Sequence, residues 1–143
     1  MFRLTSFLKR ASGLDRKAFV DGWVNGLMDK VLRHPMSERS VRHAVIDLPF
    51  DSVAEEDLWI VCDDFDGVAE LWFDDLPAAI VTGNALAADA GIGALADGLI
   101  DADACVSWIG HAVDDFDGPG VAIKRIVAGQ QREDLTLEEA QDY

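Results

Sequence analysis

The chain is poor in basic residues, and this shortage limits the partners it can have. Its 143 residues include 12 Lys+Arg against 27 Asp+Glu, which gives a net charge of −15. Nucleic acid and anionic membrane surfaces are therefore not expected as partners. The acidity indicates either a general solubility feature or a specific acidic interface, and the solubility feature is the simpler interpretation.

Cysteine is also scarce, and two thiols alone do not make a disulfide framework. Cys62 and Cys105 each lie in an apolar run without metal-ligand spacing, which fits a reducing compartment. The N-terminus lacks the apolar core of a signal peptide, and no stretch approaches the roughly 20 apolar residues of a membrane span. We therefore predict a cytoplasmic protein without a membrane segment.

Short catalytic and cofactor motifs are missing as well. The three histidines show no metal-ligand spacing, and the sequence contains no nucleophile elbow, phosphate loop or dinucleotide fingerprint. The acidic sequence DDFDG occurs at 63–67 and at 114–118, but neither copy continues as an EF-hand loop. These residues predict turns rather than calcium sites, and neither a metal nor a cofactor is expected.

The most informative stretch that is present is DFDGVAELWFDD, residues 64–75. It alternates as a strand that is sheltered on both faces, with Val68, Glu70 and Trp72 on one side. Burying a carboxylate between two apolar neighbours costs free energy unless another group donates a hydrogen bond to it or neutralises its charge. Glu70 therefore marks either a structural partner or a functional site.

The patterns before this strand predict a strand, a helix and a second strand. The first strand is predicted at residues 2–9. Asp15 is a good N-cap for the helix that follows. In this helix, pairs of apolar residues recur every four positions until His34-Pro35. The second strand is predicted at residues 39–48, where Val41 and His43 would share a face.

The patterns after the 64–75 stretch predict a second helix and a last strand. The complete predicted order is strand, helix, two strands, helix, strand. Residues 58–62 are either an extension of the sheet or an insertion. Asp74 or Asp75 caps a helix with Pro77 in its first turn, and the helical region 78–99 is expected to break near Gly91 and Gly93. In the last strand, 104–113, Trp108 lies on one face and His111 on the other. An α+β fold follows.

Two separated motifs resemble the EthD-like family from about residue 2 to about residue 113. The front segment is Phe7-Leu8-Lys9-Arg10, Gly13-Leu14, Phe19 and Trp23, and the second motif is the 64–75 block, similar to the family's fDGvaElwFd. The resemblance implies a ferredoxin-like βαββαβ subunit, with helices on one face of an antiparallel sheet. The other face packs against a partner's sheet, which makes a dimeric α+β barrel.

The resemblance implies that the protein binds a small hydrophobic or aromatic compound and works in a catabolic or tailoring pathway, oxidative or otherwise. One hypothesis is cofactor-independent conversion, of an oxidoreductase-associated or lyase type, by Glu70 assisted by His43 or His111. The alternative is a non-catalytic accessory module that only binds the ligand. Glu70 matches the family position, whereas Gly22 and the residues 25–27 stand where many relatives carry histidines. The expected pocket residues are Trp72, Trp108 and Val41.

The C-terminal residues repeat part of the beginning. Residues 1–118 are predicted as the EthD-like domain, and 123–136 can be aligned with 2–15, with Thr136 and Glu139 forming a capping box. The segment 119–143 is then either the start of a second repeat or a decoration of a single domain. The expected partner is accordingly a second copy in a homodimer, or a second repeat.

Overall fold

The computed structural model describes residues 1–48 and 65–111. These residues belong to the first of two units, Met1–Val113. The segment 58–62, predicted as a sheet extension or an insertion, lies outside the described residues, as do the second DDFDG sequence and the C-terminal segment 119–143.

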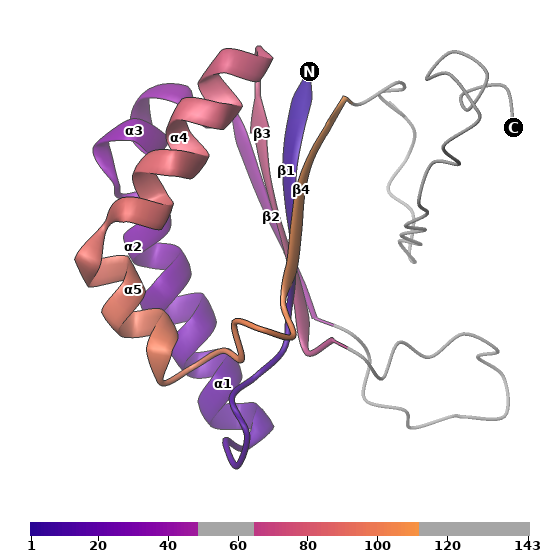
Figure 1. Ribbon diagram of the computed structural model, residues 1–143, viewed down its shortest axis with the longest axis vertical. Coiled ribbons are helices and arrows are strands. Elements are labelled where there is room, and N and C mark those ends of the chain that lie inside the picture. Colours follow the sequence, from indigo (N-terminus) through magenta and orange to yellow (C-terminus); the bar gives the residue numbers. More distant parts are fainter. Residues whose placement is uncertain (49–64, 112–143) are drawn as a thin grey trace, which may run out of the picture. The chain divides into compact units, whose positions relative to one another are not determined.

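Four strands form one antiparallel sheet with the order β2-β3-β1-β4. Figure 1 shows that the described helices all lie on one face of this sheet. The predicted α+β class and the order βαββαβ are confirmed, and the arrangement is consistent with a ferredoxin-like fold. The strands are β1 (Phe2–Leu8), β2 (His43–Asp47), β3 (Gly67–Phe73) and β4 (Val106–His111).

The first helical region runs without a break through α1 (Arg16–Gly22), the π-helix η1 (Trp23–Met28) and α2 (Asp29–Leu32). It begins as predicted, because the Asp15 side chain accepts a hydrogen bond from Ala18 N at 2.9 Å. Its apolar residues repeat every four positions, which would drift by about 40° per step in a helix of 3.6 residues per turn. A π-helix has more residues per turn, so η1 offsets this drift, and the apolar residues stay on the side of the helix that faces the sheet.

A short helix, α3 (Pro35–Ser40), replaces the beginning of the predicted second strand. Proline stops a preceding helix but is also well suited to the first position of a new one. His34 Nδ1 accepts a hydrogen bond from Met36 N at 3.2 Å and so caps this helix. The strand prediction for 39–48 was therefore wrong at its start, and β2 begins only at His43.

The second helical region is divided into α4 (Leu76–Ala88) and α5 (Ala90–Asp97), which meet at an angle of 67°. Asp75 caps α4 as predicted, and the break lies at Asp89, close to the expected glycines. Among the described residues, no single helix has both the length and the apolar composition needed to cross a bilayer; α4 and α5 reach them only as a bent pair.

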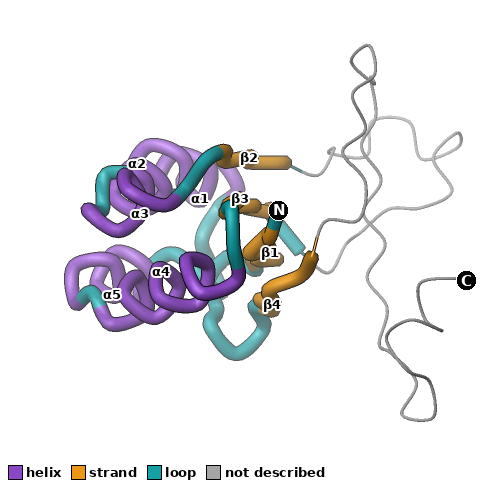
Figure 2. The backbone as a smooth tube through the Cα atoms, turned by 90° about the horizontal axis from the view of Figure 1, so that it is seen from above, coloured by secondary structure: helices purple, strands orange, loops and turns teal. Residues whose placement is uncertain are grey.

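The core lies between the helices and one face of the sheet, which we call the helix face. Trp23 and Phe73 are completely buried there, one from the helical layer and one from the sheet. Figure 2 shows that α1 to α3 lie over the β2 side and that α4 and α5 lie over the β1 and β4 side. The other face of the sheet is covered by none of the described helices.

Candidate functional site

The face of the sheet opposite the helices carries Glu70 at its centre, and we call it the Glu70 face. The strand register sets its side chains in three rows across β2, β3, β1 and β4. The central row is Val45, Glu70, Thr5 and Trp108; the rows beside it are His43, Trp72, Arg3 and Gly110, and Asp47, Val68, Phe7 and Val106.

Glu70 is paired with Arg3 across β3 and β1. Arg3 Nη1 lies 3.3 Å from Glu70 Oε1, and the Glu70 side chain is 2% exposed whereas that of Arg3 is 34% exposed. The Arg3 guanidinium also lies over the Trp72 ring, 5.2 Å from its centroid. The carboxylate is thus neutralised by a cation that an aromatic ring holds in place.

Aromatic rings border the other side of Glu70. Phe7 and Trp108 stack at a centroid separation of 5.0 Å, and Phe65 packs edge-on against Phe7 at 5.1 Å. Thr5, which is 1% exposed, lies in register between Glu70 and Trp108. Its hydroxyl and the Trp72 indole nitrogen have no hydrogen-bond partner among residues 1–48 and 65–111.

Four of the six predicted site residues share this face, namely Glu70, His43, Trp72 and Trp108. His43 is exposed and lies directly opposite Trp72, which makes it a diagonal neighbour of Glu70. Such neighbours are about 7–8 Å apart, a separation that long side chains can bridge and that also leaves room for a bound molecule between them.

The structure places the other two, Val41 and His111, elsewhere. His111 is on the helix face at the sheet edge, where its ring meets Phe2 edge-on at 5.0 Å. Val41 precedes β2 and packs against the core between sheet and helices. The predicted pairing of His111 with Glu70 is therefore wrong within one subunit, because residues that alternate along a strand point to opposite faces.

Three further residues of this face, Arg3, Thr5 and Phe7, were not predicted. Arg3 and Thr5 alternate with the apolar Phe2 and Leu4 of the helix face, a signal that could have identified these two but not Phe7, whose neighbour Ser6 is polar. Arg3 carries the clearest signal of the three, because a cation inside a strand needs a counterion when that strand lies inside the sheet, as β1 does.

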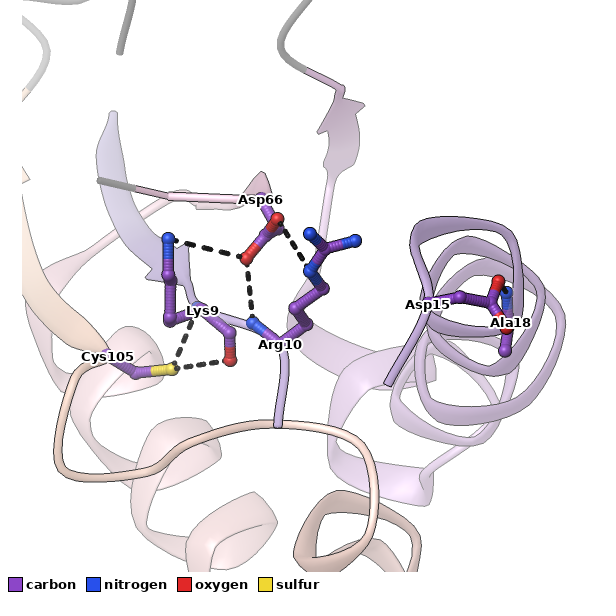
Figure 3. A network of polar contacts seen from close by, with 6 residues as sticks. All are labelled: Lys9, Arg10, Asp15, Ala18, Asp66 and Cys105. Carbon is purple, nitrogen blue, oxygen red and sulfur yellow. Dashed lines mark hydrogen bonds and ion pairs between the residues drawn. The ribbon is translucent and has the colours of Figure 1, made fainter. Parts of the chain in front are cut away.

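The other motif residues have structural roles close to the end of β1. Asp66 accepts a hydrogen bond from Arg10 N at 3.0 Å, and its carboxylate lies 3.3 Å from Arg10 Nε and 3.8 Å from Lys9 Nζ (Figure 3). Gly67 lies under the Trp23 ring, where a Cβ atom would be 2.1 Å from Cζ3. The front segment and the 64–75 block are thus joined by contacts that maintain the fold.

Cys105 belongs to the same structural corner, as Figure 3 shows. Lys9 N donates a hydrogen bond to its Sγ at 3.2 Å. Burial raises the pKa of the Cys105 thiol, whereas this hydrogen bond acts in the opposite direction. The described part of the chain contains no cluster of three or more His, Cys, Asp or Glu side chains able to hold a metal ion.

No protein-family model matches the chain, and no curated protein matches it significantly. The likeness to the EthD-like family therefore consists of the residues quoted above, and what it implies for function is a proposal.

Proposed function

We propose that the protein is an EthD-like, dimeric α+β-barrel protein that binds a small hydrophobic or aromatic compound against the Glu70 face. A second copy, or a second repeat, would close the space over this face. The observation that carries the proposal is the buried Glu70 carboxylate, paired with Arg3 on the face that no described helix covers. Ligand sites combine apolar walls with a few fixed polar groups, and this face has both.

We propose acid–base chemistry at Glu70 in a catabolic or tailoring pathway. Glu70 Oε would take a proton from the ligand, and the electron pair left behind would remain on the ligand. Arg3, 34% exposed and held by Trp72, is placed to stabilise negative charge that develops on a ligand oxygen. His43, at the rim, would assist by exchanging protons with the ligand or with Glu70.

A non-catalytic binding module is the second candidate. It is favoured by the Arg3–Glu70 ion pair, since this contact gives the buried carboxylate a structural role as the counterion of an arginine. Gly22 and the residues 25–27, which stand where many EthD-like proteins carry histidines, favour it too.

The aromatic pair Phe7 and Trp108 is the expected platform for an aromatic ligand. We expect Trp108→Ala to weaken binding of 1-naphthol by about tenfold or more, because stacking contributes about 0.5–1.5 kcal/mol beyond the apolar area it buries. Quenching of intrinsic tryptophan fluorescence measures the binding. Leu95→Ala removes an exposed apolar side chain of α5 and serves as the control. Equal affinities of Trp108→Ala and wild type for 1-naphthol would refute the platform.

Glu70→Gln separates the two candidate functions. This change keeps the shape of the side chain but removes its ability to accept a proton as a carboxylate. If Glu70 is the general base, turnover of compounds that bind the wild type should fall by about 10²–10⁴-fold while their binding is retained. Glu38→Gln, an exposed substitution on α3 with the same charge change, should leave turnover unchanged. Turnover by Glu70→Gln at the wild-type rate would exclude catalysis by Glu70.

A further inference from the structure

The outer face of α4 is apolar although it lies at the surface. Leu76, Ile80 and Val81 are 39%, 44% and 53% exposed, and the helix contains no charged residue. Its inner side buries Ala79, Thr82 and Leu86. Thr82 and Asn84 are the only polar side chains of α4, and a helix that is apolar on most sides is normally covered on those sides. The exposed face of α4, here defined by Leu76, Ile80 and Val81, is therefore a candidate docking surface.

A groove of about 490 Å³ runs beside the exposed face of α4, between this helix and the strands β1 and β4. Ile80, Gly83, Asn84 and Ala87 form its helical wall. A Cβ atom at Gly83 would come no closer than 3.9 Å to the Leu4 side chain, so the glycine widens the groove. Polar groups in the sheet wall are already satisfied, because the Ser107 hydroxyl donates to the Ser6 hydroxyl at 2.8 Å. Apolar side chains can thus enter the groove while these two hydroxyls keep their hydrogen bond to each other.

The distribution of charge indicates which partner suits this face. The chain carries a net charge of −15, yet Asp89 is the only charged residue between Leu76 and Ala96. The Asp89 carboxylate caps α5, accepting a hydrogen bond from Ile92 N at 2.8 Å, and lies 3.8 Å from His34 Nε2. Two copies of so acidic a protein repel each other over most of their surfaces, but the exposed face of α4 brings no charge to a contact.

We propose that the exposed face of α4 packs against the same face of a second copy around a two-fold axis. In this arrangement Val81 and Leu76 of each copy enter the groove of the other, because a two-fold contact must be self-complementary. The helix is only about 20 Å long, so the contact is smaller than the roughly 800 Å² per partner of a standard interface. It should accordingly be reversible, and salt should strengthen it by screening the repulsion. It does not depend on any pairing of the Glu70 faces.

Sedimentation velocity over a concentration series tests this contact. The double substitution Ile80→Asp and Val81→Asp should weaken the concentration-dependent doubling of mass by at least tenfold, because it places carboxylates in an apolar interface. Asn25→Asp adds a negative charge to an exposed position of η1 and should leave the doubling intact. The wild-type doubling should strengthen when NaCl rises from about 0.05 M to about 0.5 M. Thermal unfolding verifies that the variants are folded.

The starting species shows whether the proposed pairing of the Glu70 faces is also present. If it is, the wild type starts as a dimer with two α4 faces and associates into tetramers or longer chains; if it is not, the wild type passes from monomers to dimers. In both cases the α4 variant should stop at the smaller species. Doubling of the α4 variant at wild-type concentrations would overturn the contact, and so would a wild type that never doubles. Flotation of the wild type, but not of this variant, with phosphatidylcholine vesicles would assign the face to a membrane instead.

Discussion

Gly67→Ala is expected to lower the free energy of unfolding by about 3 kcal/mol, because among the described glycines an added Cβ atom would make its closest contact here. The added Cβ atom would lie 2.1 Å and 2.4 Å from two carbons of the Trp23 ring. Neither partner can yield easily, because Trp23 is completely buried and Gly67 belongs to an inner strand of the sheet. Urea unfolding followed by circular dichroism measures the loss.

Two further variants identify the cause of this loss. Gly26→Ala is the matched control, because a Cβ atom at Gly26 meets nothing within 4 Å, and we expect it to be neutral or slightly stabilising. Trp23→Leu removes the ring, so Gly67→Ala should cost clearly less in that background than in the wild type. A Gly67→Ala variant within about 0.5 kcal/mol of wild type would show that the Trp23 ring does not lie on this glycine.

Arg3→Met is expected to lower the free energy of unfolding by about 2 kcal/mol. The substitution keeps much of the packing volume but removes the cation 3.3 Å from a carboxylate that is almost completely buried. Breaking a fully buried ion pair costs about 3–5 kcal/mol, and the 34% exposure of Arg3 reduces the expected loss.

The double variant Arg3→Met with Glu70→Gln should recover more than half of that loss, because a neutral amide is less costly to bury than a charge. Arg39→Met changes an exposed arginine on α3 and should shift stability by less than about 0.5 kcal/mol. An Arg3→Met variant as stable as wild type, or no recovery in the double variant, would mean that the ion pair does not hold Glu70.

The features that the sequence predicts correctly depend on residues close together in the chain. Asp15 and Asp75 cap their helices through a backbone N–H three residues on, so each cap can be recognised within four letters. The apolar alternation of β3 and the four-residue stripe of the first helical region are local in the same way. The error at His34-Pro35 is also local, and it arose because proline both ends one helix and begins another.

The features that could not be predicted depend on register and on packing between distant segments. The Arg3–Glu70 pair requires β1 to lie beside β3 with Thr5 opposite Glu70, which neither strand specifies alone. His111 is a different case: the alternation along its own strand already put it and Trp108 on opposite faces, and only its residue type suggested a place in the site. The role of Gly67 likewise becomes visible only when Trp23 is placed above it.

A crystal structure of the protein purified rapidly from fresh lysate tests the central claim most directly, because it shows what covers Glu70. We predict that the Glu70 face lies against the same face of a second copy or against a second repeat. An apolar ligand should occupy the space beside Trp108 and Arg3. A Glu70 face that is open to solvent in every copy, or that packs against helices only, would contradict both the barrel and the site.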